Sequence, residues 1–315
     1  MADPGWKVYL GGEARTPSAT LVRWLANPPP WRRLEPCAPV DRTEAAGLAS
    51  DVERRGRTYV SSGAQEVLRV NMALLLRRPL LVAGPPGVGK SSLAYNIAWC
   101  LGLGAPLRWE ISSQTTLQDG LYTYDAVAHL QATHASSSAA IGDFVTLGPL
   151  GTALLPTARP RVLLVDELDK SSFDLPNDLL HVFEEGAFTI RELIRTGLDH
   201  EVFPYDHVHA GDRVPVHGGR VRTLHHPIVV ITSNGERNFP EAFLRRCVTL
   251  QLSRPNNEQL TAIVRAQLGD EVLPARLATA FEQLRDQTTD VLLQALFLES
   301  RFGAEPEGVA EALRR

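Results

Sequence analysis

The sequence contains no long apolar run. Nowhere in its 315 residues do about 20 apolar residues stand together, which is the length that a bilayer-spanning helix needs. Its first residues, MADPGWKVYLGGEARTP, lack the apolar core of a signal peptide. We therefore expect a protein that neither spans a membrane nor is exported, and we place it in the cytoplasm.

Cysteine is also scarce. The chain has Cys37, Cys100 and Cys247, which lie far apart and form no CxxC pair. An odd number of separated cysteines excludes a disulfide framework and favours a reducing compartment, in agreement with a cytoplasmic location.

Neither sign of charge is in large excess, since 36 acidic and 32 basic residues give a net charge of −4. A chain-wide grip on nucleic acid needs a basic field, so we do not expect a nucleic-acid partner. The short basic runs at 53–57 and 220–222 are interpreted as solvated faces. Apolar residues make up 44% of the chain, enough for the core of one large domain or two.

Residues 1–58 differ from the rest of the chain. They carry Trp6, Trp24, Trp31 and a run of three prolines, without a sustained hydrophobic period. Two interpretations remain open for this N-terminal extension: a segment laid over the core or offered to a partner, or a partly ordered tail.

Short apolar segments alternate with helical patterns in the middle of the chain. Four segments predict buried strands: 80–83, 107–111, 162–165 and 228–232. Helical patterns cover 67–76, 91–104 and 175–185, the last with Asp174 as its N-cap and Gly186 as its stop. After about Ser253 the pattern is helical, as in NNEQLTAIVRAQLG and PARLATAFEQL. This order predicts an α/β domain with a parallel sheet, followed by a small all-α domain.

A glycine-rich motif follows the first predicted strand and opens a helix. The sequence GPPGVGKS at 84–91 satisfies the phosphate-binding pattern GxxxxGK[ST] at every fixed position. Its glycines let several backbone N–H groups point inward as an anion nest, and the helix adds its positive N-terminal end. A glycine-rich turn without a ligand is the alternative, which this strand–turn–helix context disfavours. The predicted nucleotide-binding residues are Gly84, Pro85, Pro86, Gly87, Val88, Gly89, Lys90, Ser91 and Ser92.

Two adjacent carboxylates end the strand VLLV at 162–165. A phosphate-binding loop needs an acid on a second strand for the magnesium shell and a group that positions the attacking water. We assign Asp166, with the Ser91 hydroxyl, to Mg²⁺, and Glu167 to orienting or deprotonating water. The alternative is two solvated acids that close a strand. The predicted substrate is ATP and the predicted metal is Mg²⁺.

Three segments together resemble the MoxR branch of the AAA+ ATPases. They are GPPGVGKSSLA, VLLVDELDKSSFDLPNDLLHVFEEGAFTI and IVVITSNGERNFPEAFLRRC, and the resemblance covers roughly residues 58–255. It implies an α/β AAA+ core with a central parallel sheet and a C-terminal all-α lid. The implied domains are an extension at 1–58, a core at 59–253 with insertions at about 121–156 and 187–227, and a lid at 254–315. The chain also resembles MoxR-like proteins with von Willebrand A-type partners in bacterial conflict systems.

The resemblance also implies roles for individual residues. Asn234 matches the first sensor, although an Asx-turn cap is its alternative. Arg245 and Arg246 match the arginine-finger segment, Arg246 better; the alternative is a surface arginine pair. Such a finger would reach the ATP of a neighbouring subunit, so hydrolysis would need a homo-oligomeric ring, commonly a hexamer. The insertions would face the pore or a partner.

Some positions remain open. Tyr59 and Val60 are candidates for the adenine pocket. Asp290 and Val291 stand where the second-sensor arginine of relatives is expected, which leaves Arg285 and Arg301 as weak substitutes. The insertion 187–227 is histidine-rich, and His207 with His209 could share one side of a strand, but polar loop residues are the favoured interpretation over a metal site.

The leading functional hypothesis is an ATP-driven remodelling ATPase that acts on a protein client or a co-encoded partner. The alternatives are an ATP-gated assembly switch or scaffold with little turnover, and a nucleic-acid motor or loader. GTPase chemistry is disfavoured because the sequence has no NKxD-type base-reading segment.

Overall fold

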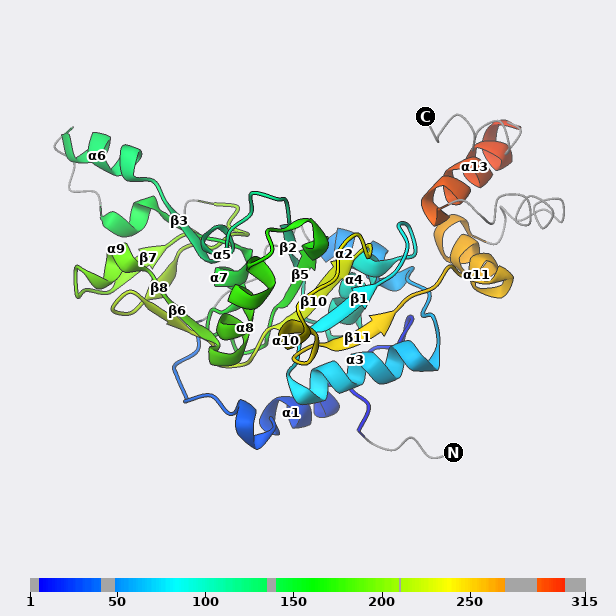
Figure 1. Ribbon diagram of the computed structural model, residues 1–315, viewed down its shortest axis with the longest axis horizontal. Helices are drawn as coiled ribbons and strands as arrows, with labels where there is room; N and C mark the ends of the chain where they lie inside the picture. Colours follow the sequence, from blue (N-terminus) through cyan, green and yellow to red (C-terminus); the bar gives the residue numbers. More distant parts are fainter. Residues whose placement is uncertain (1–5, 41–48, 135–139, 210, 270–287, 304–315) are drawn as a thin grey trace.

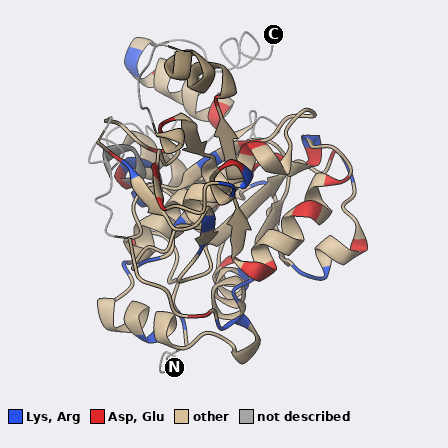
Figure 2. Cartoon of the chain, turned by 90° about the vertical axis from the view of Figure 1, so that its left-hand side faces the viewer, with Lys and Arg blue, Asp and Glu red and all other residues tan. Residues whose placement is uncertain are grey.

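A computed structural model describes residues 6–40, 49–134, 140–209, 211–269 and 288–303 (Figure 1). Among these residues, no helix combines the length and the apolarity that crossing a bilayer requires. Both signs of charge occur throughout the described chain (Figure 2).

A five-stranded parallel sheet forms the centre of the fold, in the order β11-β1-β10-β5-β2. Two of its three inner strands, β5 and β10, are buried at every position because helices cover both faces. The predicted α/β class with a parallel central sheet is therefore confirmed. The strand bounds are β1 Leu80–Ala83, β2 Leu107–Glu110, β5 Val162–Asp166, β10 Ile228–Ser233 and β11 Val248–Gln251.

The edge strand β11 was missed by the sequence prediction. Its residues alternate between buried and exposed, so VTLQ has no continuous apolar run to mark it. It pairs with β1 in parallel, with Leu80 opposite Val248. This pairing places the chain that precedes β11, which includes Arg246, at the amino edge of the sheet.

Successive residues of each central strand enter different hydrophobic clusters, as the two-residue period of a strand requires. Leu163 and Val165 pack on one face with α8 (Leu175–Glu185), whereas Val162 and Leu164 pack on the other with α3 (Ala64–Leu76) and α4 (Lys90–Leu101). The second face also carries α2 (Ala49–Arg57), which lies against α4. Two cores therefore hold the sheet between them.

The start of α8 differs from the prediction in one respect. Asp174 occupies the N-cap position, but its side chain makes no capping hydrogen bond. Its backbone is already helical, with φ −85° and ψ −31°, whereas a capping side chain needs an extended backbone. Gly186 does end the helix, in the left-handed conformation that glycine favours.

The described part of the N-terminal extension lies over the core. Its helix α1 (Ser18–Ala26) buries Leu21 and Trp24, and a 3₁₀ turn follows at Pro30–Arg32. The Trp24 indole N–H donates to the carbonyl of Leu74, and the side-chain oxygen of Asn71 accepts from the backbone N–H groups of residues 8 and 9. Residues 6–40 therefore fit the first of the two interpretations, a segment laid over the core.

The two insertions form antiparallel pairs on one side of the sheet, at the left of Figure 1. In the first insertion, β3 (Tyr122–Tyr124) pairs with β4 (Val145–Leu147), and helices α6 (Ala126–His134) and α7 (Pro149–Ala153) lie in the same segment. The short helix α5 (Leu117–Leu121) leads into it. The second contains the pairs β6 (Ala187–Thr189) with β9 (Arg220–Arg222) and β7 (His200–Val202) with β8 (Val214–Val216), and the helix α9 (Arg191–Ile194). Backbone hydrogen bonds from Phe203 to Val145 and from Leu147 to Phe203 join the insertions.

In the described C-terminal part the chain forms two helices, which lie at the opposite end of Figure 1. They are α11 (Asn257–Leu268), which begins with a capping box between Asn256 and Gln259, and α13 (Thr289–Phe302). They pack through a small apolar cluster: Leu260, Val264, Leu292, Ala295 and Leu296. The predicted helical stretch at 274–284 lies outside the described residues.

Replacing Trp24 by Ala should lower the free energy of unfolding by about 3 to 5 kcal/mol, because a buried indole and its hydrogen bond are lost. Val22→Ala is the matched control on the same helix, since Val22 is exposed, and should change it by less than about 0.5 kcal/mol. Urea denaturation of the full-length variants measures both. Equal midpoints for the two variants would show that the N-terminal segment is not part of the cooperative fold.

Candidate active site

The glycine-rich loop leaves the carboxyl end of β1 and enters α4. Gly84, Gly87 and Gly89 all have positive φ angles of 157°, 76° and 91°. A Cβ on Gly84 would lie 2.4 Å from the carbonyl oxygen of Leu252, so this position accepts glycine alone. The loop therefore combines a left-handed backbone with a close approach to the chain that follows β11, which explains its composition.

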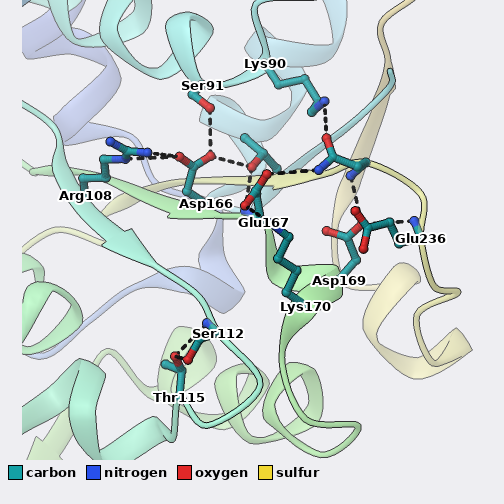
Figure 3. Close-up of polar contacts among 12 residues, drawn as sticks. Lys90, Ser91, Arg108, Ser112, Thr115, Asp166, Glu167, Asp169, Lys170 and Glu236 are labelled. Carbon is teal, nitrogen blue, oxygen red and sulfur yellow. Dashed lines mark hydrogen bonds and ion pairs between the residues drawn. The ribbon is translucent and has the colours of Figure 1, made fainter. Parts of the chain in front are cut away.

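Lys90, the first residue of α4, is nearly fully buried and points back over the loop (Figure 3). Its ammonium donates to the carbonyl oxygens of Gly84 and Pro85, both at 2.8 Å, and to the Asn234 side-chain oxygen at 2.7 Å. Burial lowers the pKa of Lys90, and the carboxylates of Asp169, Glu167 and Asp166 oppose that shift. Because these three acceptors are uncharged, none of them offsets the positive charge of the ammonium.

Asp166 ends β5 and receives hydrogen bonds from three other elements (Figure 3). Its Oδ1 accepts from the hydroxyl groups of Ser91 at 2.8 Å and Thr232 at 2.7 Å, and its Oδ2 accepts two bonds from Arg108. Burial alone would raise the pKa of Asp166, but these donors outweigh it and lower the pKa below its ordinary value. The carboxylate is therefore ionised and fixed beside the Ser91 hydroxyl.

Sequence reasoning missed two of these donors. Thr232 brings the one hydroxyl of IVVIT in β10 to the carboxyl edge, where it also accepts the backbone N–H of Glu167 at 2.8 Å. Arg108 comes from β2, the neighbour of β5, and also pairs with Glu110. A hydroxyl inside an apolar strand and an arginine within a short strand were the available signals, but only strand order shows what they contact.

Glu167 follows Asp166 in the left-handed conformation, with φ 62° and ψ 49°. This backbone is uncommon for a non-glycine residue and turns the chain sharply at the end of β5. Its Oε1 accepts from the Asn234 amide nitrogen at 3.1 Å, and its Oε2 accepts from Lys170 at 2.7 Å. The hydrogen bond from Lys170 is the main cause of the lowered pKa of Glu167. The side chain is about 40% exposed, so solvent reaches it.

Asp169 is a further carboxylate that the sequence analysis did not assign. It is buried in the 3₁₀ turn Leu168–Lys170, and its Oδ2 accepts the backbone N–H groups of Asn234 and Glu236 at 2.9 and 3.1 Å. These bonds fix the start of the loop after β10. Because Asn234 lies in that loop, Asp169 sets the position of the amide that touches both Lys90 and Glu167.

A cavity of about 330 Å³ adjoins the glycine-rich loop. Tyr59 and Val60 line it together with Gly87, Val88, Gly89 and Ser92, so six predicted nucleotide-binding residues share one space. The Tyr59 hydroxyl donates to the buried carboxylate of Glu66 at 2.7 Å, which fixes the ring. Pro86 is exposed at the tip of the loop.

Further residues line the same cavity, and the sequence analysis had given some of them another role. Arg54 and Arg55 belong to a basic run taken for a solvated face, but they line this cavity. From the C-terminal helices come Ile263, Gln267, Thr289, Asp290 and Leu293. Asp290 lies against the loop, because a Cβ on Gly87 would be 3.0 Å from its carboxylate. Arg301 lies in the last turn of α13, away from this wall, and Arg285 lies outside the described residues.

Arg245 and Arg246 lie away from the loop, at the amino ends of the strands, whereas the loop follows the carboxyl end of β1. The backbone N–H of Val248 donates to Pro79, at the start of β1, whereas that of Leu252 donates to Ala83, at its end. At about 3.3 Å per residue, roughly 13 Å separates the level of Leu80 from that of Gly84. Arg246 donates to Glu184 at 2.7 Å, and Arg245 pairs with Glu241. The structure therefore brings Glu167 and Asn234 to the loop but not the two arginines.

The family model of the ATPase family associated with various cellular activities (AAA) matches residues 80–254, more than half of the chain. The chain belongs to this family. None of the curated proteins compared with it matches. Nucleotide binding and ATP hydrolysis are general properties of AAA proteins, and the matched span contains the loop, Asp166, Glu167 and Asn234.

Three histidines of the second insertion of this AAA protein make local contacts. His200 bonds to the Thr196 hydroxyl, His207 to the carbonyl of Pro204, and His217 to the Asp199 carboxylate. Within the described ranges, no three His, Cys, Asp or Glu residues gather as ligands for a metal ion.

Thr232→Val keeps the shape of the side chain but removes both hydrogen bonds of its hydroxyl. It should lower the free energy of unfolding by about 1 to 3 kcal/mol, because the Glu167 N–H loses its acceptor. Thr249→Val, at an exposed position of β11, is the matched control and should be close to neutral. Equal denaturation midpoints for the two variants would contradict a structural role for this hydroxyl.

Proposed function

We propose that this AAA protein hydrolyses Mg-ATP at the loop between β1 and α4 and uses the energy to remodel or activate a partner protein. The observation that carries the proposal is the position of the Asn234 amide. Its oxygen accepts from Lys90 and its nitrogen donates to Glu167, so a phosphate-binding cation and a candidate base lie on either side of one neutral side chain.

The triphosphate would bind to the backbone N–H groups of residues 84–91 and to the ammonium of Lys90. To do so it would replace the carbonyl oxygens of Gly84 and Pro85 as acceptors for Lys90, exchanging neutral acceptors for charged ones. The base would enter the cavity beside Tyr59 and Val60, where the fixed tyrosine ring offers a flat apolar face.

The donor set at Asp166 fits magnesium. A hydroxyl and an ionised carboxylate 2.8 Å apart are hard oxygen ligands, and Mg²⁺ is commonly held by one or two such groups together with phosphate oxygens. Ser91 and Asp166 would hold the ion, which neutralises charge on the phosphates when bound. Arg108 and Thr232 would keep the Asp166 carboxylate in place.

Glu167 would orient the attacking water and accept its proton. Its lowered pKa, caused chiefly by the hydrogen bond from Lys170, keeps the carboxylate ionised at neutral pH. Asn234 would fix the side chain from the other side and would contact the terminal phosphate without adding charge. Each carboxylate oxygen can accept a second hydrogen bond, so Oε2 can bind water while Lys170 still donates to it.

We further propose a homo-oligomeric ring, commonly a hexamer in the MoxR branch that the motifs resemble. Arg246 supports this proposal, because it lies at the amino edge of the sheet while the loop of the same chain lies at the carboxyl edge. An arginine there would reach the ATP of the next subunit. The insertions, with exposed Val127 and Leu130 on α6, would contact the client, which the resemblance suggests to be a von Willebrand A-type partner.

In domain terms, we propose that residues 59–253 form the ATPase core and that residues 254–315 form a lid. The described helices α11 and α13 supply one wall of the nucleotide cavity, which supports a lid that senses the bound nucleotide.

An ATP-gated assembly switch with little turnover is the second candidate. The contact between Lys170 and Glu167 favours it, because an ammonium at 2.7 Å lowers the pKa of the candidate base and makes it a weaker proton acceptor. A phosphate-release assay on the parental protein separates the two functions, since the switch would bind Mg-ATP but release almost no phosphate.

Glu167→Gln should leave ATP bound but reduce turnover by roughly 100-fold or more, because the amide cannot accept a proton from water. Glu236→Gln is the matched control, at an exposed acid two residues beyond Asn234, and should keep the parental rate. Phosphate release and nucleotide binding are measured on the same samples. Turnover of the Glu167 variant at the parental rate would remove this residue from the mechanism.

Arg246→Ala should retain ATP binding but lose hydrolysis when assayed alone. Mixed with Lys90→Ala subunits, which keep Arg246 but lose the phosphate contact, it should regain activity, because Arg246 of a Lys90→Ala subunit can then serve the intact loop of an Arg246→Ala neighbour. Arg245→Ala controls for loss of an adjacent charge and should remain active. No recovery in the mixture, or full activity of the Arg246 variant alone, would contradict action between subunits.

A further inference from the structure

A second cavity, of about 270 Å³, lies between the N-terminal segment and the sheet. Residues 25–34 form one wall, and residues 77 and 224–226 form the other. Half of its lining is cationic or titratable and the other half is apolar, and among the described residues no carboxylate lines it. The polar members are Arg32, Arg33, Arg77, His225 and His226.

This cavity is separate from the nucleotide site. Arg77 lies just before β1, and His225 and His226 lie just before β10, so the cavity opens at the amino edge of the sheet. The glycine-rich loop and Asn234 follow the same two strands at their carboxyl ends. A ligand bound here would therefore not be the ATP bound to the loop of the same chain.

Within the described part of the chain, none of the three arginines at this site forms an ion pair with a carboxylate. Burial lowers the pKa of Arg77 to about 10, and its guanidinium stacks on Trp24 and donates to the carbonyl oxygens of Leu74 and Trp24. Arg32 donates to the carbonyl of Phe183. The carboxylate that acts on Arg32, Glu184, is already paired with Arg246 at 2.7 Å. An anion in the cavity would be stabilised by these charges.

His226 gives an independent indication of a ligand. The residue is only 7% exposed, and within the described chain its Nε2 has no hydrogen-bond partner. Burial, and then the charges of Arg32, Arg77 and His225, lower its pKa to about 4, against a hydrogen bond with the Arg32 backbone. A buried polar nitrogen without a partner costs stability, and because Nε2 has almost no accessible surface, the ring would have to turn to present it to a ligand in the cavity.

We propose that this cavity binds a phosphate group, held by its three arginines and by the Nε2 of His226. Guanidinium groups match the geometry of phosphate oxygens and bind them in pairs of hydrogen bonds. The bound anion would offset the repulsion among the arginines and would let His226 take up a proton and donate to it. It would also tie residues 25–34 to the amino ends of β1 and β10.

Calorimetric titration of inorganic phosphate into full-length Lys90→Ala protein tests the proposal, because this background removes the lysine contact of the loop. We expect one saturable site, weakened about tenfold or more by Arg33→Gln, which removes a charge-assisted contact from an exposed side chain. Arg23→Gln is the matched control, since Arg23 is exposed on α1 and does not line the cavity. It should leave the affinity unchanged.

A parallel titration with ADP distinguishes free phosphate from the phosphate groups of a nucleotide, and saturable binding of either that Arg33→Gln weakens supports the site. Titration in two buffers of different ionisation enthalpy should show more proton uptake near neutral pH than the same titration of a His226→Gln variant, which corrects for the phosphate group's own titration in this range. Equal proton balances for the two proteins would contradict the role given to His226. No saturable binding of either probe, or equal weakening by Arg23→Gln and Arg33→Gln, would overturn the proposal.

Discussion

The neutral amide of Asn234 separates a buried lysine from a carboxylate at the carboxyl edge of the sheet. Were Lys90 paired directly with Glu167, each charge would neutralise the other and neither would be available to a ligand. Instead, Lys90 donates to uncharged oxygens and Glu167 accepts from the amide. Buried charges are tolerated only when hydrogen-bonded, and the bonds of Lys90 satisfy its charge without cancelling it. Glu167 is about 40% exposed and has its own cation in Lys170. The chemistry proposed for this AAA protein depends on that separation.

The parallel sheet gives the molecule two edges with different chemistry. The carboxyl edge carries the glycine-rich loop and its carboxylates, whereas the amino edge carries Arg77, Arg246 and the two histidines before β10. The N-terminal segment joins the second edge to the core, because Trp24 packs against α3 and beneath Arg77. In a ring, one subunit would present its carboxyl edge to the amino edge of the next. Contacts across the sheet could then connect nucleotide state to assembly.

How much the sequence could predict depends on the range of the interaction. The loop, Asp166 and Glu167 are local motifs with fixed spacing, and the order of apolar segments sufficed for the α/β class. Thr232, Arg108 and Asp169 were not found, because each acts through a partner 58 to 67 residues away that only strand order brings near. The strand β11 was missed because its exposed residues break the apolar run. Arg54 and Arg55 look like any solvated basic run until α2 is packed against α4.

The central claim is that a triphosphate and its magnesium ion bind at the loop between β1 and α4. Calorimetric titration of Mg-ATP into the parental chain and into Lys90→Ala tests it most directly. The account predicts saturable binding to the parental chain, lost when magnesium is chelated and lost in the Lys90 variant. A parental chain that shows no affinity for Mg-ATP, or a Lys90 variant that binds it equally well, would contradict the account.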